Sequence, residues 1–170
     1  KANPKRVVFA EANHINMLKA AAEAKAEGVC QPVLLGNWDY LHKLAGDENI
    51  NLDGIEIINM RSDAETDRRH RYARILSKKR EREGVTYSEA CEIMFDRNAF
   101  GMMMVETGDA DAFITGVYSR YSEITEMAEQ IIGIRAPYKH FGLRVRQGRL
   151  RLAENFDKAP LPSLHRRHIL

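Results

Sequence analysis

The chain has 170 residues, of which 44% are apolar and 29% are charged. This length and composition are typical of a single globular domain with a hydrophobic core, and no apolar run is long enough to cross a bilayer. The net charge is only +2, and its basic excess lies in residues 143–170. We therefore expect a cytoplasmic protein that binds neither membranes nor, through its mildly acidic first 142 residues, nucleic acid.

Short apolar segments alternate with helical ones along the first 132 residues. The strands are predicted from β-branched and apolar runs, and the helices from helical periodicity, capping residues and terminal glycines. In chain order the predicted elements are a strand at 6–10, a helix at 14–27, a strand at 32–35, a helix at 38–45, a strand at 56–58, helices at 62–83, 88–96 and 97–107, a strand at 112–115, and a helix at 122–132.

This alternation predicts an α/β fold. Strands separated by helices at such intervals form right-handed βαβ units and a mainly parallel sheet. The strands read as continuous apolar runs, which is typical of a sheet covered on both faces. The sequence therefore predicts a three-layer α/β/α domain over residues 1–142.

The character of the sequence changes after residue 142. Residues 143–152 (LRVRQGRLRL) alternate apolar and basic side chains around a Gln-Gly pair, which predicts a β-hairpin with a two-residue turn. Residues 155–170 contain two prolines and little periodicity, so we expect them to be irregular or loosely packed, and residues 143–170 as a whole to form an atypical basic tail. The chain begins with Lys rather than Met, and we expect it to be a segment of a longer protein, with a tail that is natural, truncated or altered in reading frame.

Most motifs that carry catalytic or metal chemistry are missing from the sequence. There is no P-loop, no GxGxxG, no HExxH, no Cys/His set with metal-ligand spacing and no GxSxG. The six histidines are dispersed along the chain. We accordingly predict no catalytic residue and no metal ligand from pattern alone.

The loop after the strand at 112–115 is the first candidate ligand site. Gly116 would let the backbone approach an anion, and hydroxyls and N–H groups leading into the next helix can bind phosphate oxygens. Arg120 adds a donor that can bind an oxyanion through two hydrogen bonds. The alternative is an ordinary loop in which Ser122 caps the following helix.

A cationic run at residues 78–80 is the second candidate. Its position near the end of a helix complements the helix dipole, so it is either a solvated charged face or a binding site for CoA or phosphate centred on Arg80. The candidate ligand-binding residues are Arg80, Thr115, Gly116, Ser119, Arg120 and Ser122.

Four segments carry a resemblance to a known family over residues 5–135. They are KRVVFAEA, EGVCQPVLLGN, KKREREGVTYSEA and DRNAFGMMMVETGDADAFITG. Together they resemble the phosphate acetyl/butyryltransferase (phosphotransacetylase) family, and within it the C-terminal phosphotransacetylase-like domain of NADP-dependent malic enzymes. The resemblance implies a partial phosphotransacetylase domain.

The resemblance also implies a function. Family members transfer an acyl group between CoA and phosphate, whereas the malic-enzyme domain binds acetyl-CoA or CoA, regulates the enzyme and helps to assemble it. The implied partners are a CoA ester or phosphate, the rest of a malic enzyme chain and further copies of the protein. The resemblance places NADP and a divalent metal only in other domains of the parent chain, and leaves this segment without a cofactor of its own.

Two departures from the family argue against independent catalysis. Arg80 matches the arginine before the Gly-Val-Thr motif, and Thr115-Gly116 matches the Ser-Gly of the phosphate loop, but Glu126 stands where the family has a phosphate-binding arginine. The family's other catalytic residues lie beyond Leu170. We therefore predict binding without turnover. The alternatives are a phosphate acetyltransferase (acetyl-CoA and phosphate giving acetyl phosphate and CoA) that needs a second half, and a structural dimerisation module.

Overall fold

The computed structural model describes the backbone and side chains of residues 4–134 and the backbone of residues 144–146 and 149–151. Its contacts divide the chain into two compact units, Lys1–Ile132 and Gly133–Leu170, and each is described by itself. The predicted division after residue 142 falls among residues that the structure does not describe, so it stays a prediction.

The described part of the second unit is a pair of short strands. Strands β5 (Arg144–Arg146) and β6 (Arg149–Arg151) pair in antiparallel fashion, with Val145 opposite Leu150. This pairing has the register that the alternating sequence predicts. The predicted irregular tail at 155–170 lies outside the described residues.

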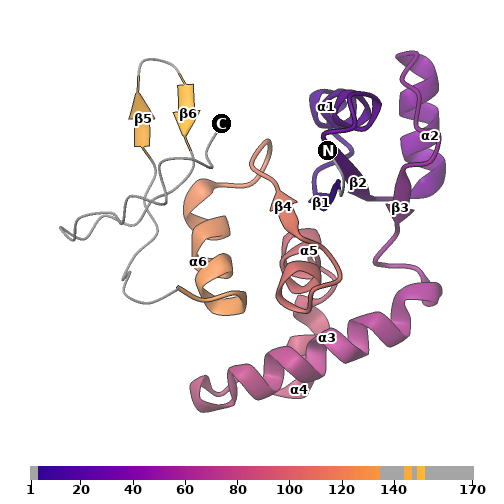
Figure 1. Cartoon of the computed structure of the whole chain (residues 1–170). Helices are drawn as coiled ribbons and strands as arrows, with labels where there is room; N and C mark the ends of the chain where they lie inside the picture. The colour runs from indigo at the N-terminus through magenta and orange to yellow at the C-terminus, as the bar shows by residue number, and fades with distance from the viewer. Residues whose placement is uncertain (1–3, 135–143, 147–148, 152–170) are drawn as a thin grey trace. The chain divides into compact units, whose positions relative to one another are not determined.

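Four parallel strands form the sheet of the first unit, in the order β3-β2-β1-β4 (Figure 1). Val8 of β1 lies opposite Val33 of β2 and Phe113 of β4. The chain runs from β1 outward to β2 and β3, and then returns to place β4 on the other side of β1. The predicted α/β fold with a mainly parallel sheet is confirmed. The strands are β1 (Lys5–Phe9), β2 (Cys30–Leu35), β3 (Glu56–Ile58) and β4 (Ala112–Ile114).

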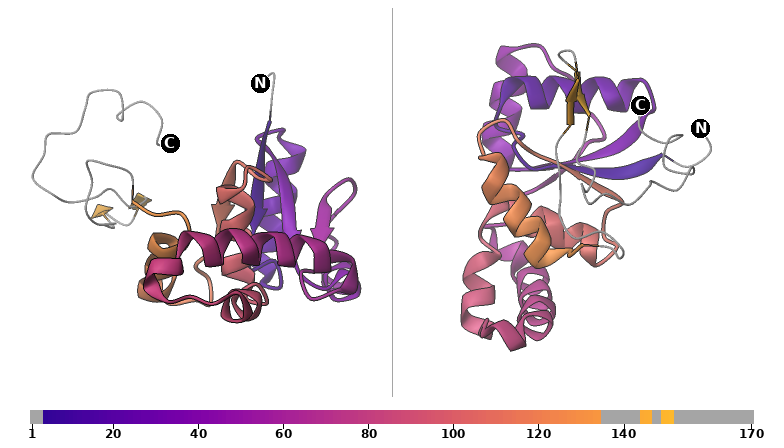
Figure 2. Two further views of the ribbon diagram at one scale, coloured as in Figure 1. Left: turned by 90° about the horizontal axis from the view of Figure 1, so that it is seen from below. Right: turned by 90° about the vertical axis from the view of Figure 1, so that its left-hand side faces the viewer.

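Helices lie on both sides of this sheet (Figure 2). Helices α1 and α2 follow β1 and β2 and cover one face, whereas α5 covers the other. Helix α6 packs beside α5, and α3 packs against α5 and α4. Among the described residues, no helix combines the length and apolar character needed to span a membrane. The helices are α1 (Ile15–Ala26), α2 (Trp38–Asp47), α3 (Thr66–Lys79), α4 (Tyr87–Ile93), α5 (Arg97–Glu106) and α6 (Tyr121–Ile131).

The strand β1 contributes to two separate hydrophobic cores. Val7 and Phe9 pack with α1 and α2, whereas Val8 and the following Ala10 pack with the helices of the opposite face. Successive strand residues point to opposite faces, so an uninterrupted apolar strand supplies both cores. This division produces the three layers that the sequence predicts.

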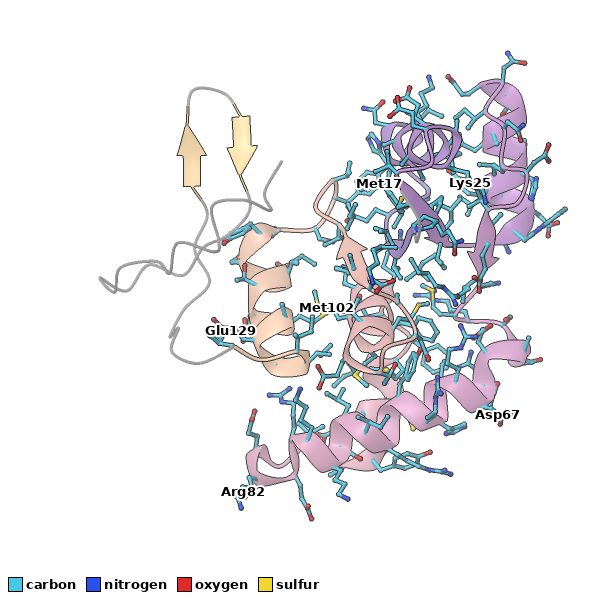
Figure 3. All side chains as sticks on the ribbon, viewed as in Figure 1. Met17, Lys25, Asp67, Arg82, Met102 and Glu129 are labelled. Atoms are coloured by element: carbon cyan, nitrogen blue, oxygen red, sulfur yellow. The ribbon has the colours of Figure 1, made fainter. Side chains whose placement is uncertain are left out.

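Helix α5 is the centre of the larger core. Phe100, Met103 and Met104 are fully buried, and Met102 is nearly so. Figure 3 shows Met102 on the side of α5 that faces α6, while Glu129 of α6 points away from it. The flexible methionines fill the irregular space between the sheet and α3, α4 and α6.

Gly101 allows α5 to approach the sheet, and we expect Gly101→Ala to destabilise the protein. A Cβ at this position would lie 2.5 Å from Cε2 of Phe113 and 3.3 Å from Cδ1 of Leu35. Overpacking of this kind costs about 1–3 kcal/mol in the free energy of unfolding, measurable by urea denaturation. Gly46 of α2 has open space around its Cβ position, so Gly46→Ala is the control, and an equal loss in both variants would contradict the packing explanation.

Helix α3 is shorter than the helix predicted at 62–83. A 3-10 turn over Asp63–Glu65 precedes it, and a second 3-10 turn over Glu81–Glu83 follows it. The next helix begins at Tyr87 because Thr86 and Glu89 form a capping box, in which each side chain accepts a hydrogen bond from the other residue's backbone N–H. This capping box sets the start of α4 one residue before the start at 88 that the sequence predicts.

The acidic turn before β4 ties three elements together. The Tyr72 hydroxyl of α3 donates to Asp109, which also pairs with Arg71. Burial, followed by this hydrogen bond, raises the pKa of Tyr72 to about 12. Asp111 accepts from the backbone N–H of Arg6 at 2.9 Å in β1. The turn thus aligns β4 beside β1 from the amino ends of the strands.

Candidate functional site

The carboxyl ends of β1 and β4 meet at the point where the chain direction across the sheet reverses. β1 leads to β2 on one side, and β4 arrives on the other. The backbone N–H of Ala10 donates to the carbonyl of Ile114 at 3.0 Å, which brings the two following loops together. Open α/β sheets bind ligands in the crevice at such a switch point, so this edge is the candidate site.

Glu11, the residue after Ala10, holds the loop that follows β4. Its carboxylate accepts hydrogen bonds from four successive backbone N–H groups, which we call the N–H nest: Gly116 at 3.0 Å, Val117, Tyr118 at 3.2 Å and Ser119 at 3.0 Å. The Ser119 hydroxyl donates to the same carboxylate at 2.8 Å. The Glu11 residue is only 1% exposed. A buried carboxylate is therefore the anion that this loop binds in the structure.

Gly116 makes this loop geometry accessible. Its φ is +113°, a conformation that side-chain-bearing residues rarely adopt. With the chain turned in this way, the next N–H groups converge on one point, as in other anion-binding nests. The predicted phosphate site at Thr115 and Gly116 stays a prediction, and in the structure the N–H groups of this loop donate to Glu11.

The charge of Glu11 sets an expected pH dependence. Burial by itself raises the pKa of this carboxyl, but hydrogen bonds from Val117, Ser119 and Tyr118 outweigh it and hold the pKa below the ordinary 4.5. A depressed pKa in the folded state stabilises the protein fully above the unfolded pKa, and that stabilisation is lost as the pH falls through the folded pKa. We expect the difference in unfolding free energy between the wild type and Glu11→Gln to be constant above about pH 5 and to shrink below it.

Comparing the wild type with Glu11→Gln isolates the effect of the Glu11 carboxylate. The other charged residues of the same cavity, Asp96, Arg97 and Glu123, are present in both proteins, so their contributions cancel in the difference. Urea denaturation of the two proteins at a series of pH values measures the difference. A difference that persists unchanged at a pH well below the ordinary pKa would contradict the role assigned to the Glu11 charge.

A chain of polar side chains extends the network from β4 to α5. The Thr115 hydroxyl donates to the side-chain oxygen Oδ1 of Asn98 at 2.7 Å. The side-chain NH2 group of Asn98 donates to the Ser119 hydroxyl at 3.1 Å. Asn98 is only 6% exposed. Thr115 and Ser119, both predicted site residues, are thus brought together by two residues that the sequence interpretation missed, Glu11 and Asn98.

A cavity of about 450 Å³ opens beside this network. Arg97 contributes its only cationic group among the described lining residues, and its guanidinium donates to the side-chain oxygen of Asn13 at 2.7 Å. Within residues 4–134, no cluster of three His, Cys, Asp or Glu could hold a metal ion. The described lining residues are Glu11, Asn13, Asp96, Arg97, Asn98, Tyr118, Ser119 and Glu123.

A larger hollow of about 620 Å³ lies elsewhere, between α1 and the segment after α2. Lys19, Glu48 and Asp53 are among its lining residues, and it borders the turns that lead into β2 and β3. This places it near the amino ends of the strands, where parallel α/β sheets do not carry their ligand sites. The smaller cavity at the switch point is therefore the candidate site.

The remaining predicted residues of the loop lie at the surface. The Arg120 side chain is 83% exposed, and its guanidinium lies 3.7 Å from Glu123. Ser122 is exposed inside α6, and the alternative in which it caps that helix is wrong, because α6 begins one residue earlier, at Tyr121, after Arg120. Neither Arg120 nor Ser122 lines the cavity.

Glu126 also lies away from the cavity. It is exposed on α6, where the Gln130 amide donates to it at 3.4 Å. The α6 carboxylate that lines the cavity is Glu123, one helical turn earlier. The electrostatic role expected for Glu126 beside an anion therefore has no counterpart in the geometry of the described cavity.

Arg80 is separated from the other predicted site residues. It lies at the end of α3, where its guanidinium binds Glu83 at 2.6 Å and Gln130 at 3.1 Å. Gln130 is near the carboxyl end of α6, whereas the loop precedes its amino end, and eleven helical residues span about 16 Å. The Arg80 side chain is 14% exposed, so the expectation of a solvated charged face is wrong at this residue.

Comparisons with known proteins identify relatives. The family model described as phosphate acetyl/butaryl transferase matches residues 1–143. The chain is 30% identical over 145 residues to an NADP-dependent malic enzyme of Rhizobium meliloti, a match that covers 84% of this chain and 19% of that enzyme. It is 32% identical over 130 residues to a phosphate acetyltransferase of Synechocystis, with 75% of this chain and 18% of that enzyme covered.

Two solved structures share the fold. A phosphotransacetylase from Streptococcus pyogenes matches with a TM-score of 0.72 and 26% identity, over 82% of this chain and 41% of that one. The EutD phosphotransacetylase from Staphylococcus aureus matches with a TM-score of 0.70 and 23% identity, over 85% and 44%. The chain thus spans less than half of each of these relatives. With the family model matching most of its length, the chain belongs to the phosphate acetyl/butaryl transferase family.

Proposed function

We propose that this phosphotransacetylase-like domain binds CoA or acetyl-CoA at the switch-point cavity and does not transfer acyl groups by itself. The observation that carries the proposal is the position of Glu11, whose carboxylate takes up the hydrogen bonds of the N–H nest. Acyl transfer requires donors aimed at the developing oxyanion. With a carboxylate already there, the loop lacks this stabilisation.

The lining of the cavity favours the acyl-pantetheine part of a CoA ester over free phosphate. Asn13, Asn98 and Ser119 offer neutral hydrogen-bonding groups, and Tyr118 offers an aromatic surface. The carboxylates that share the cavity repel a free dianion. Its volume of about 450 Å³ lies within the range of small-molecule sites.

Calorimetry with acetyl-CoA tests the proposal. We expect the wild type to bind with a dissociation constant between about 1 µM and 1 mM, and Arg97→Ala to bind about tenfold more weakly, because it loses a charged donor of the cavity. Arg82→Ala is the matched control, since Arg82 is exposed on the 3-10 turn after α3. No binding at millimolar ligand would favour a structural dimerisation module instead.

A phosphate acetyltransferase that needs a second half is the alternative function, and the matched phosphate acetyltransferase of Synechocystis favours it. An assay for acetyl phosphate formation separates the two, because turnover above background would overturn the non-catalytic proposal. We expect Glu126→Arg to restore no activity, since Glu126 is exposed and does not line the cavity. A gain of activity in this variant would favour the alternative.

We also propose that the domain acts within a larger cytoplasmic assembly. The match to a malic enzyme supports a role in regulation by CoA esters and in assembly of that enzyme. Light scattering of this chain over a range of concentrations tests for a homo-oligomer. A monomer at every concentration would remove the assembly role from this segment.

A further inference from the structure

The occupant of the N–H nest is part of the protein itself. Four successive N–H groups, from Gly116 to Ser119, point at one carboxylate that reaches them from the end of β1. Both oxygens of Glu11 accept, because Oε2 binds the Gly116 and Val117 N–H groups and Oε1 binds Ser119. An external oxyanion at this position would require the same donors, since nests of this kind bind anions through convergent N–H groups.

We propose that Glu11 is an internal anion that determines the specificity of the site: it fills the N–H nest and excludes external oxyanions from it. The proposal rests on the proposed function only in placing the ligand at the same cavity. With Glu11 in place, a ligand enters the cavity without using the nest. With Glu11 removed, the nest becomes a binding site for a small oxyanion.

Among the described residues, the two other carboxylates near this cavity, Asp96 and Glu123, have partners outside the nest. Asp96 caps α5, its carboxylate accepting from the N–H groups of Asn98 and Ala99. Glu123 lies near Arg120 at the cavity rim. Neither carboxylate reaches the nest, whose donors are therefore left without an acceptor when Glu11 is truncated. Buried donors without acceptors are unfavourable, so an added anion gains by replacing the lost carboxylate.

Rescue of Glu11→Ala by formate tests this directly, because formate has the carboxylate that the variant lacks. We expect the variant to unfold about 5–10 °C below the wild type. Addition of about 100 mM sodium formate should raise its Tm by about 2–5 °C more than the same concentration of sodium chloride. The wild type should respond equally to the two salts, and an equal response of the variant would overturn the proposal.

Asp111→Ala is the matched control. Asp111 also accepts a backbone N–H, from Arg6 at 2.9 Å, but its side chain is 42% exposed and its other partner is Lys5. Water satisfies the donors that this substitution frees, so we expect no specific response to formate. A formate response as large in Asp111→Ala as in Glu11→Ala would show a general salt effect and overturn the proposal.

The wild type provides a measurement that does not depend on the folding of a variant. Titration with inorganic phosphate, followed through the amide resonances of residues 116–119, should leave them unshifted at millimolar concentration. Phosphate-dependent shifts there would show that an external anion enters beside or in place of Glu11, and would overturn the proposal. Acetyl-CoA binding is measured separately by calorimetry. A lack of acetyl-CoA binding would therefore contradict the proposed function without changing the outcome of the formate test.

Discussion

Glu11→Gln is expected to lower the free energy of unfolding at neutral pH by about 2–4 kcal/mol. The substitution preserves the shape of the side chain but replaces one acceptor oxygen with an NH2 group. In the N–H nest that group would face the N–H donors of Gly116 and Val117, or that of Ser119. Because the site is buried, water does not compensate for the lost acceptor.

Glu126→Gln is the control for this result. Glu126 is exposed, and a single hydrogen bond of 3.4 Å from Gln130 is described for its carboxylate. Solvent replaces such a contact, so the unfolding free energy of this variant should equal that of the wild type within error. Equal effects of the two substitutions in urea denaturation would show that Glu11 contributes no more than a surface carboxylate.

Phe100→Ala is expected to have the largest effect in the hydrophobic core, a loss of about 3–5 kcal/mol. Phe100 is fully buried on α5, and its ring centroid lies 5.2 Å from that of Tyr72 on α3. Truncation would leave a cavity between these helices and the sheet. Close-packed neighbours relax only partly into such a space, so both the transfer and the cavity contributions are lost.

Phe95→Ala is the matched control, five residues earlier in the chain. Phe95 is 39% exposed, and its ring centroid lies 4.8 Å from Cζ of the Arg69 guanidinium. Its truncation removes a partly solvated contact and leaves no enclosed cavity, so the destabilisation should be markedly smaller. Equal losses of stability would contradict the assignment of α5 as the centre of the core.

For part of the candidate site, the sequence predicts a position in the chain, and the structure shows where that position lies in the fold. Thr115, Gly116 and Ser119 do lie where a parallel strand ends at the switch point. A strand followed by glycine and hydroxyl residues is a pattern of neighbouring residues, so it can be recognised without knowing which distant segments pack together. Whether these residues bind CoA or phosphate stays a proposal.

The positions of Glu11 and Arg80 in the fold could not be predicted from the sequence. The single available signal for Glu11 was an acidic residue directly after a buried strand, and nothing local tied it to a loop over a hundred residues later in the chain. Arg80 is a second candidate in the sequence because of its cationic run and its match to a family arginine, and no local signal gives its distance from the loop. In the fold it binds Glu83 and Gln130 at the opposite end of α6.

By itself, the sequence determined the order of strands and helices, the parallel sheet and the apolar faces, because capping, turns and periodicity act over a few residues. The tertiary structure alone decided that β4 lies beside β1, and that a carboxylate from one loop fills the nest formed by the other. Such pairings depend on which distant segments pack together. The free energy that selects them comes from burial of the whole core, which no short pattern of residues encodes.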